Sequence, residues 1–162
     1  MAMARLRDLG RSDIALVVAA GAEDNPPGSR RFVERIQATG LDTIYNLGYR
    51  LSLAETYAAL GESDATVYPS LCESFSAAYL MAMERGAPLI AADLDFARMV
   101  CGDAAAYFRY DSPDDLAARL IELADNPAAR QALVECGRER SKHYTVDRML
   151  GGFLDAIAAA QT

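Results

Sequence analysis

Residues 65–93, ATVYPSLCESFSAAYLMAMERGAPLIAAD, decide the fold of this chain. Residues 66–68 are strand formers, and the Pro-Ser pair after them ends the strand. Helix formers run from residue 76 to residue 84, and a Gly and a Pro shortly after them end the helix. Residues 89–92 are apolar and predict a second strand. Strand, helix and strand in this order predict one unit of a parallel α/β sheet.

The loop between the first strand and the helix carries one acid, Glu73. In a parallel α/β unit, the carboxyl end of the strand and the amino end of the helix face the ligand crevice. We therefore expect Glu73 and the backbone amides of residues 74–77 to share one small concave site. The alternative is a solvated loop acid followed by an ordinary helix N-cap at Ser74 or Ser76.

The composition predicts a single domain over residues 1–162, with a hydrophobic fraction of 52% that is sufficient for a core. There is no transmembrane segment, because no run of about 18 apolar residues occurs, and the N-terminus lacks the apolar stretch of a signal peptide. The three cysteines are widely spaced, which is typical of reduced thiols in a cytoplasmic protein. Neither a metal site nor a cofactor is predicted.

The charge distribution excludes several classes of function. The net charge of −7 argues against a nucleic-acid-binding protein. His143 is the only histidine and lies next to Lys142 at the end of a charged helical segment. A Ser-His-Asp triad or a histidine-rich metal cluster is therefore not expected.

The rest of the chain continues the alternation of strands and helices. Further strands are predicted at residues 14–20, 43–47 and 104–108, and turn residues at 22–30 predict a loop. Ser52 and Glu55 have the spacing of a capping box. This pattern predicts a doubly wound parallel sheet in three layers. Helices are predicted at residues 1–9, 30–39, 52–60, 114–124, 127–142 and 145–160, with a helical turn at 96–100.

The order of these motifs resembles the C-terminal, donor-binding domain of a GT-B glycosyltransferase, of the retaining group 1 (family 4) type. The specific part is P-S-x-x-E-x-F at residues 69–75, followed by A-M-x-x-G-x-P-x-I at residues 82–90. The resemblance extends from about residue 14 to the end of the chain. It implies a Rossmann-like GT-B half.

The resemblance also implies the site residues. Glu73 would be the catalytic residue and would accept hydrogen bonds from sugar hydroxyls, while the amides after it would face a phosphate oxygen. The turn after the strand at 43–47 would lie along the base, with Tyr49 either as a stacking face or as a half-buried hydrophobic anchor. The substrate-binding residues implied are Glu73, Ser74, Phe75, Ser76, Ala77, Gly48, Tyr49, Arg50 and Met81.

Three departures from the family pattern stand out. The usual E-G-F-G loop has serine at both glycine positions, Ser74 and Ser76. Met81 occupies the position of a second glutamate that binds the ribose hydroxyls, and its loss weakens ribose recognition by about 1.5–3 kcal/mol. The opening strand of the family domain, with its phosphate-binding bases, has no counterpart. The chain is then a fragment, or that strand comes from elsewhere, or the sheet closes differently.

The resemblance implies transfer of a hexosyl group from an NDP-sugar donor to an acceptor hydroxyl with retention. The acceptor-binding N-terminal domain is expected outside this chain, so the chain alone is predicted to be inactive. A homodimer is another expected association. The alternative function is a non-catalytic GT-B-like module with a degenerate donor site that acts in protein–protein association. A dehydrogenase-type nucleotide domain is disfavoured, since no G-x-G-x-x-G follows a strand.

Overall fold

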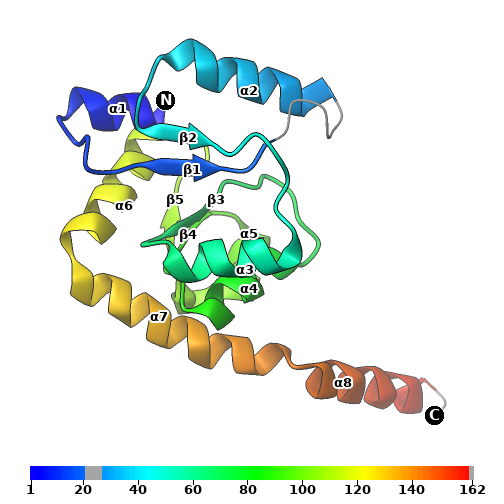
Figure 1. The fold of residues 1–162 in the computed structure, drawn as a ribbon. Helices are drawn as coiled ribbons and strands as arrows, with labels where there is room; N and C mark the ends of the chain where they lie inside the picture. Colours follow the sequence, from blue (N-terminus) through cyan, green and yellow to red (C-terminus); the bar gives the residue numbers. More distant parts are fainter. Residues whose placement is uncertain (21–26, 161–162) are drawn as a thin grey trace.

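The computed structural model describes residues 1–20 and 27–160, and it is an α/β structure with every paired strand parallel (Figure 1). Residues 22–26 of the predicted loop lie outside the described residues. Residues 27–30 were also predicted as loop, but they form the first turn of the helix Pro27–Thr39, which therefore begins before residue 30. The strands are β1 (Leu16–Val18), β2 (Ile44–Asn46), β3 (Thr66–Tyr68), β4 (Leu89–Ala92) and β5 (Ala105–Phe108). The α-helices are α1 (Ala2–Asp8), α2 (Pro27–Thr39), α3 (Leu53–Glu62), α4 (Ala77–Arg85), α5 (Asp95–Cys101), α6 (Pro113–Asp125), α7 (Pro127–Ser141) and α8 (Val146–Ala159), with 3₁₀ turns η1 (Gly102–Ala104) and η2 (Lys142–Tyr144).

The central strand β4 explains the three layers. All four of its residues are buried, and it pairs with β3 on one side and β5 on the other. Leu89 and Ala91 belong to a core formed with α4 and α5, whereas Ile90 and Ala92 belong to a core formed with Phe108 and helices α6 and α7. Because successive residues of a strand face opposite sides, one short apolar strand contributes to both layers.

The strands form two sheets, β1-β2 and β3-β4-β5, where the sequence predicts one. The amide of Leu16 donates to Thr43 O at 2.8 Å, and Val18 O accepts from the amide of Leu47 at 2.9 Å. Alternation in a parallel strand then directs the peptide groups of Val17 away from β2, towards an edge with no paired strand. The side chain of Val17 is 60% exposed. Strand pairing therefore stops at β1 in the smaller sheet and at β3 in the larger one.

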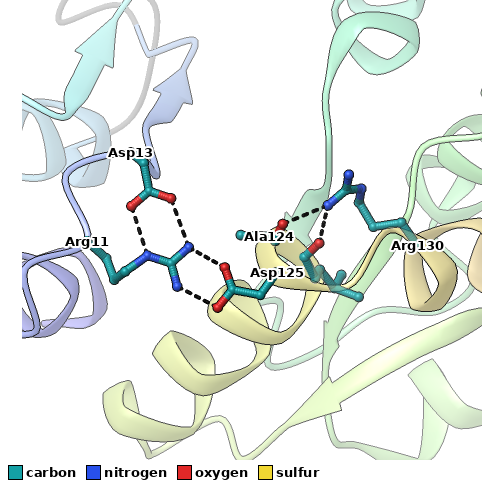
Figure 2. A network of polar contacts seen from close by, with 6 residues as sticks. Arg11, Asp13, Ala124, Asp125 and Arg130 are labelled. Carbon is teal, nitrogen blue, oxygen red and sulfur yellow. Dashed lines mark hydrogen bonds and ion pairs between the residues drawn. The ribbon is translucent and has the colours of Figure 1, made fainter.

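Helices α1 and α6 join the two sheets. Met3 and Leu6 of α1 pack with Ala117 of α6 and with Leu16 and Ile44 from the smaller sheet. Next to this core, the Arg11 guanidinium lies between two carboxylates, with both of its Nη atoms 2.8–2.9 Å from Asp125 and further bonds to Asp13 (Figure 2). These carboxylates raise the pKa of Arg11. The smaller sheet is thus held by helix packing and by an ion-pair network.

Most local predictions are confirmed. Ser52 and Glu55 form the capping box of α3, and Gly86 ends α4 with a φ of 69°. Ser112 and Thr145 cap α6 and α8 through their side chains. Strands β3 and β4 have the predicted bounds, and β5 is one residue shorter. Strands β1 and β2 are shorter than predicted and pair only with each other.

The C-terminal helix α8 extends away from the sheets (Figure 1). None of its residues is buried, although Leu150, Phe153 and Ile157 are large and apolar. No helix within residues 1–20 and 27–160 is both long and apolar enough to cross a membrane.

Candidate functional site

The candidate site is the loop of residues 69–76, between the carboxyl end of β3 and the amino end of α4. The hydroxyl of Ser70 donates a hydrogen bond to Glu73 Oε1 at 3.0 Å, and Glu73 is partly buried. The carboxylate is thus held by the turn before it and is not a freely solvated acid. Glu73 Oε2 has no hydrogen-bond partner among the described residues, which leaves it available to a ligand hydroxyl.

Ser76 has a strained backbone. Its φ of 55° makes it the one non-glycine residue with positive φ in the part of the chain that the structure describes. An L-residue in this region costs roughly 1–3 kcal/mol, and such strain clusters at ligand-binding loops. The serine therefore keeps the positive φ that a glycine would adopt freely.

The amino end of α4 is open to an anion. Ser76 is the N-cap residue, but its side chain makes no capping hydrogen bond, and the first turn has no acidic residue. The amide of Tyr79 donates to Ser76 O at 3.2 Å, whereas the amides of Ala77 and Ala78 have no partner within the described segments. Free amides and the helix dipole together favour negative charge at this end.

Aromatic side chains at and beside the loop pack against one another. Phe75 lies against Tyr144 with ring centroids 5.4 Å apart, and Tyr68 meets Tyr79 edge to face at 5.5 Å. Tyr79 belongs to the core around α4, and Tyr68 packs against that core. Burial raises the pKa of Tyr79 to about 12, with smaller contributions from Cys101, Glu73 and Tyr68. The Tyr79 hydroxyl therefore keeps its proton at neutral pH.

The second predicted segment, Gly48, Tyr49 and Arg50, follows β2 at the corresponding end of its sheet. Gly48 has a φ of 78°, and its amide donates to Asn46 Oδ1 at 3.1 Å. Tyr49 is 47% exposed, and Arg50 is exposed without a hydrogen bond or ion pair among the described residues. Both side chains are accessible, and their contact with a base stays a prediction.

Met81 lies on α4 and is partly buried against the core of the larger sheet. The core contacts account for an apolar residue at this position. A thioether accepts hydrogen bonds only weakly, so Met81 does not replace a carboxylate towards ribose hydroxyls. Its place in a substrate site remains untested.

Two polar features at the carboxyl ends of strands were missed by the sequence analysis. Asn46 Oδ1 accepts a hydrogen bond from the amide of Ala20 at 3.1 Å, and Asn46 Nδ2 donates one to Ala20 O at 3.0 Å. These two bonds connect the chain just after β1 to the end of β2. Asp93, after β4, pairs with Arg98, which lowers the pKa of Asp93 and lies 4.3 Å above the ring of Tyr107. Their positions directly after or at the end of apolar strands were the available signal.

A shallow hollow of about 200 Å³ lies between the carboxyl ends of β3 and β5, lined by Met1, Pro69, Phe108, Tyr110 and Leu116 among others. Glu73 does not line it. The predicted concave site around Glu73 therefore remains a prediction. No group of three metal-ligating side chains occurs among residues 1–20 and 27–160, and His143 is exposed on η2 beside Arg148.

Solved structures share this fold. The sucrose-phosphate synthase of Thermosynechococcus elongatus superposes with a TM-score of 0.73 at 21% identity, covering 98% of this chain and 42% of that one. TarM gives a TM-score of 0.76 at 14% identity, with coverage of 95% and 30%. A glycosyltransferase from Rickettsia africae ESF-5 gives 0.78 at 17% identity, with coverage of 96% and 42%. The chain thus spans less than half the length of these proteins.

The search of curated proteins found no match to this sequence. Residues 1–140, most of the chain, match the sequence model of the family described as glycosyl transferases group 1. This match includes the loop with Glu73, both sheets and helices α1 to α6. The resemblance to group 1 glycosyltransferases inferred from the motifs is confirmed, and the chain belongs to the glycosyl transferases group 1 family.

Proposed function

We propose that this chain is the donor-binding domain of a glycosyltransferase that moves a hexosyl group from an NDP-sugar to an acceptor hydroxyl with retention. The observation that carries the proposal is one loop that presents two complementary groups. It holds a carboxylate with a free oxygen at Glu73, and a few residues later it presents the free amides of Ala77 and Ala78. Membership of the glycosyl transferases group 1 family supports this assignment.

The two groups suit the two ends of a sugar diphosphate. The Glu73 carboxylate accepts hydrogen bonds from sugar hydroxyls and orients the anomeric carbon towards the acceptor. The amino end of α4 stabilises the negative charge that develops on the departing diphosphate. Tyr49 and Arg50, both exposed, are the residues proposed to lie along the base.

Transfer itself requires an acceptor site, which we assign to a separate N-terminal domain of a larger enzyme. The coverage of 30–42% of the solved structures supports this division. The chain alone is then expected to bind a donor without transferring its sugar. The family match lends no support to a purely structural association module.

The test is a thermal-shift and calorimetric titration of the chain with uridine, guanosine and adenosine diphosphates and with their glucose esters. One base is expected to stabilise the protein, and its glucose ester is expected to bind more tightly. Glu73→Gln should lower affinity for the glucose ester by about tenfold, the effect of losing a charged hydrogen bond, and leave the diphosphate unaffected.

Glu62→Gln is the matched control, because Glu62 is an exposed acid at the end of α3, outside the loop. If none of the six nucleotides bound or stabilised the protein, the result would contradict the proposal and favour the association module. Equal binding by the wild type and Glu73→Gln would remove Glu73 from the site.

A further inference from the structure

The hydroxyl of Tyr79 is left without a partner in the core. Tyr79 is 0% exposed, and its hydroxyl is one of three buried side-chain polar atoms without a hydrogen-bond partner among the described residues. Buried hydroxyls are nearly always paired, because leaving one unpaired destabilises the folded state. A phenylalanine would fill the same space without this penalty, so packing alone does not account for the hydroxyl.

The position of Tyr79 connects it with the candidate site. It lies in the first turns of α4, three residues after the strained Ser76. Its ring meets that of Tyr68, the last residue of β3, at an interplanar angle of 86°. Tyr68 and Ser76 are the two ends of the loop that holds Glu73. The ring of Tyr79 therefore contacts the residue before the loop, and its amide bonds Ser76, the residue at which the loop ends.

Glu73 has one carboxylate oxygen that could accept a hydrogen bond from this hydroxyl. Ser70 occupies Oε1, and Oε2 has no partner within the described chain. Burial raises the pKa of Tyr79 to about 12, and the charge of Glu73 contributes in the same direction. The hydroxyl thus keeps its proton at neutral pH, as a hydrogen-bond donor to a carboxylate must.

We propose that Tyr79 is a positioning residue for Glu73, and that its hydroxyl donates a hydrogen bond to Glu73 Oε2 when the loop closes on a sugar donor. With Ser70 on the other oxygen, the carboxylate is then held at both oxygens, and their remaining lone pairs are directed at the sugar. The unpaired hydroxyl destabilises the free protein, and in the donor complex it forms a hydrogen bond to Glu73. This inference rests on the proposed function.

The experiment compares Tyr79→Phe with the wild type in two measurements. In the free protein, Tyr79→Phe is expected to raise the Tm, because it removes an unpaired buried hydroxyl and keeps the ring. With the diphosphoglucose that binds the wild type, the variant should bind about tenfold more weakly, the value of a hydrogen bond to a charged group. Its affinity for the matching nucleoside diphosphate, which has no sugar, should be unchanged. A purely structural role would change both affinities alike.

Two further variants sharpen the result. Tyr57→Phe is the matched control, because it removes a hydroxyl that bonds Glu84 outside the loop. In a Glu73→Gln background, Tyr79→Phe should have a much smaller effect on sugar binding, since the charged acceptor is gone. A lower Tm for free Tyr79→Phe would show that the hydroxyl is already paired and overturn the inference.

The inference and the proposed function fail in different ways. Equal binding of the diphosphoglucose by the wild type and Tyr79→Phe would overturn the role of Tyr79 and leave the donor site standing. Loss of sugar and diphosphate binding together would also overturn it, as a packing defect. A wild type that binds none of the nucleotide sugars would remove the donor site and the inference with it.

Discussion

Ser76 shows how one residue carries strain at the candidate site. Its φ of 55° is accessible to glycine without steric cost but strained for serine. Ser76→Gly is therefore expected to stabilise the chain by about 1 kcal/mol, after the higher entropy of glycine in the unfolded state is subtracted. Thermal unfolding should show a Tm higher by about 2–4 °C for a chain of this size.

Ser74→Gly is the comparison, since Ser74 does not have positive φ. That variant is expected to gain nothing. A Tm for Ser76→Gly at or below the wild-type value would show that the serine side chain compensates for the strain. The sequence motif located both serines, but only the dihedral angles distinguish them.

At the scale of elements, the helix caps differ in what they support. Ser52 caps α3, whose Leu60 is buried in the core, whereas Thr145 caps α8, which buries no residue. Ser52→Ala is expected to lower the global free energy of unfolding by about 1 kcal/mol. Thr145→Ala removes a similar cap but should reduce only helical circular dichroism, because α8 is not coupled to the core. Equal losses of global stability would indicate that α8 folds cooperatively with the sheets.

The elements themselves were largely predictable. Apolar runs located all five strands, and the capping box and Gly86 located two helix ends, because these signals act within a few residues. The extra residues predicted for β1 were wrong, because Ile14 packs against the core around α1 without pairing, and Ala15 and Ala19 are exposed. The partner of Asn46 was not predictable, because Ala20 lies 26 residues away.

At the scale of the whole molecule, the smaller sheet depends on α1. Leu6 is 1% exposed and lies in the core that joins α1, α6, β1 and β2. Leu6→Ala is expected to cost about 2–4 kcal/mol. Because no strand pairing links the sheets, the loss should appear first in β1 and β2, as faster hydrogen exchange of the Leu16 and Val18 amides, with the β4 amides less affected.

Leu9→Ala is the matched control on the same segment, where the side chain is 51% exposed. It should leave exchange in both sheets unchanged. Uniform acceleration across β1 to β5 in Leu6→Ala would mean that the two sheets unfold as one unit.

The sequence alone determined the parallel α/β class, the positions of the strands and helices, and the family of this chain. These properties come from local spacing, propensity and motif order, which need no distant partner. The tertiary structure decided that the strands form two sheets, that Ser70 holds one oxygen of Glu73, and that the Tyr79 hydroxyl stays unpaired. Whether a strand edge or a buried hydroxyl finds a partner depends on which segments meet in space, and no local pattern encodes that.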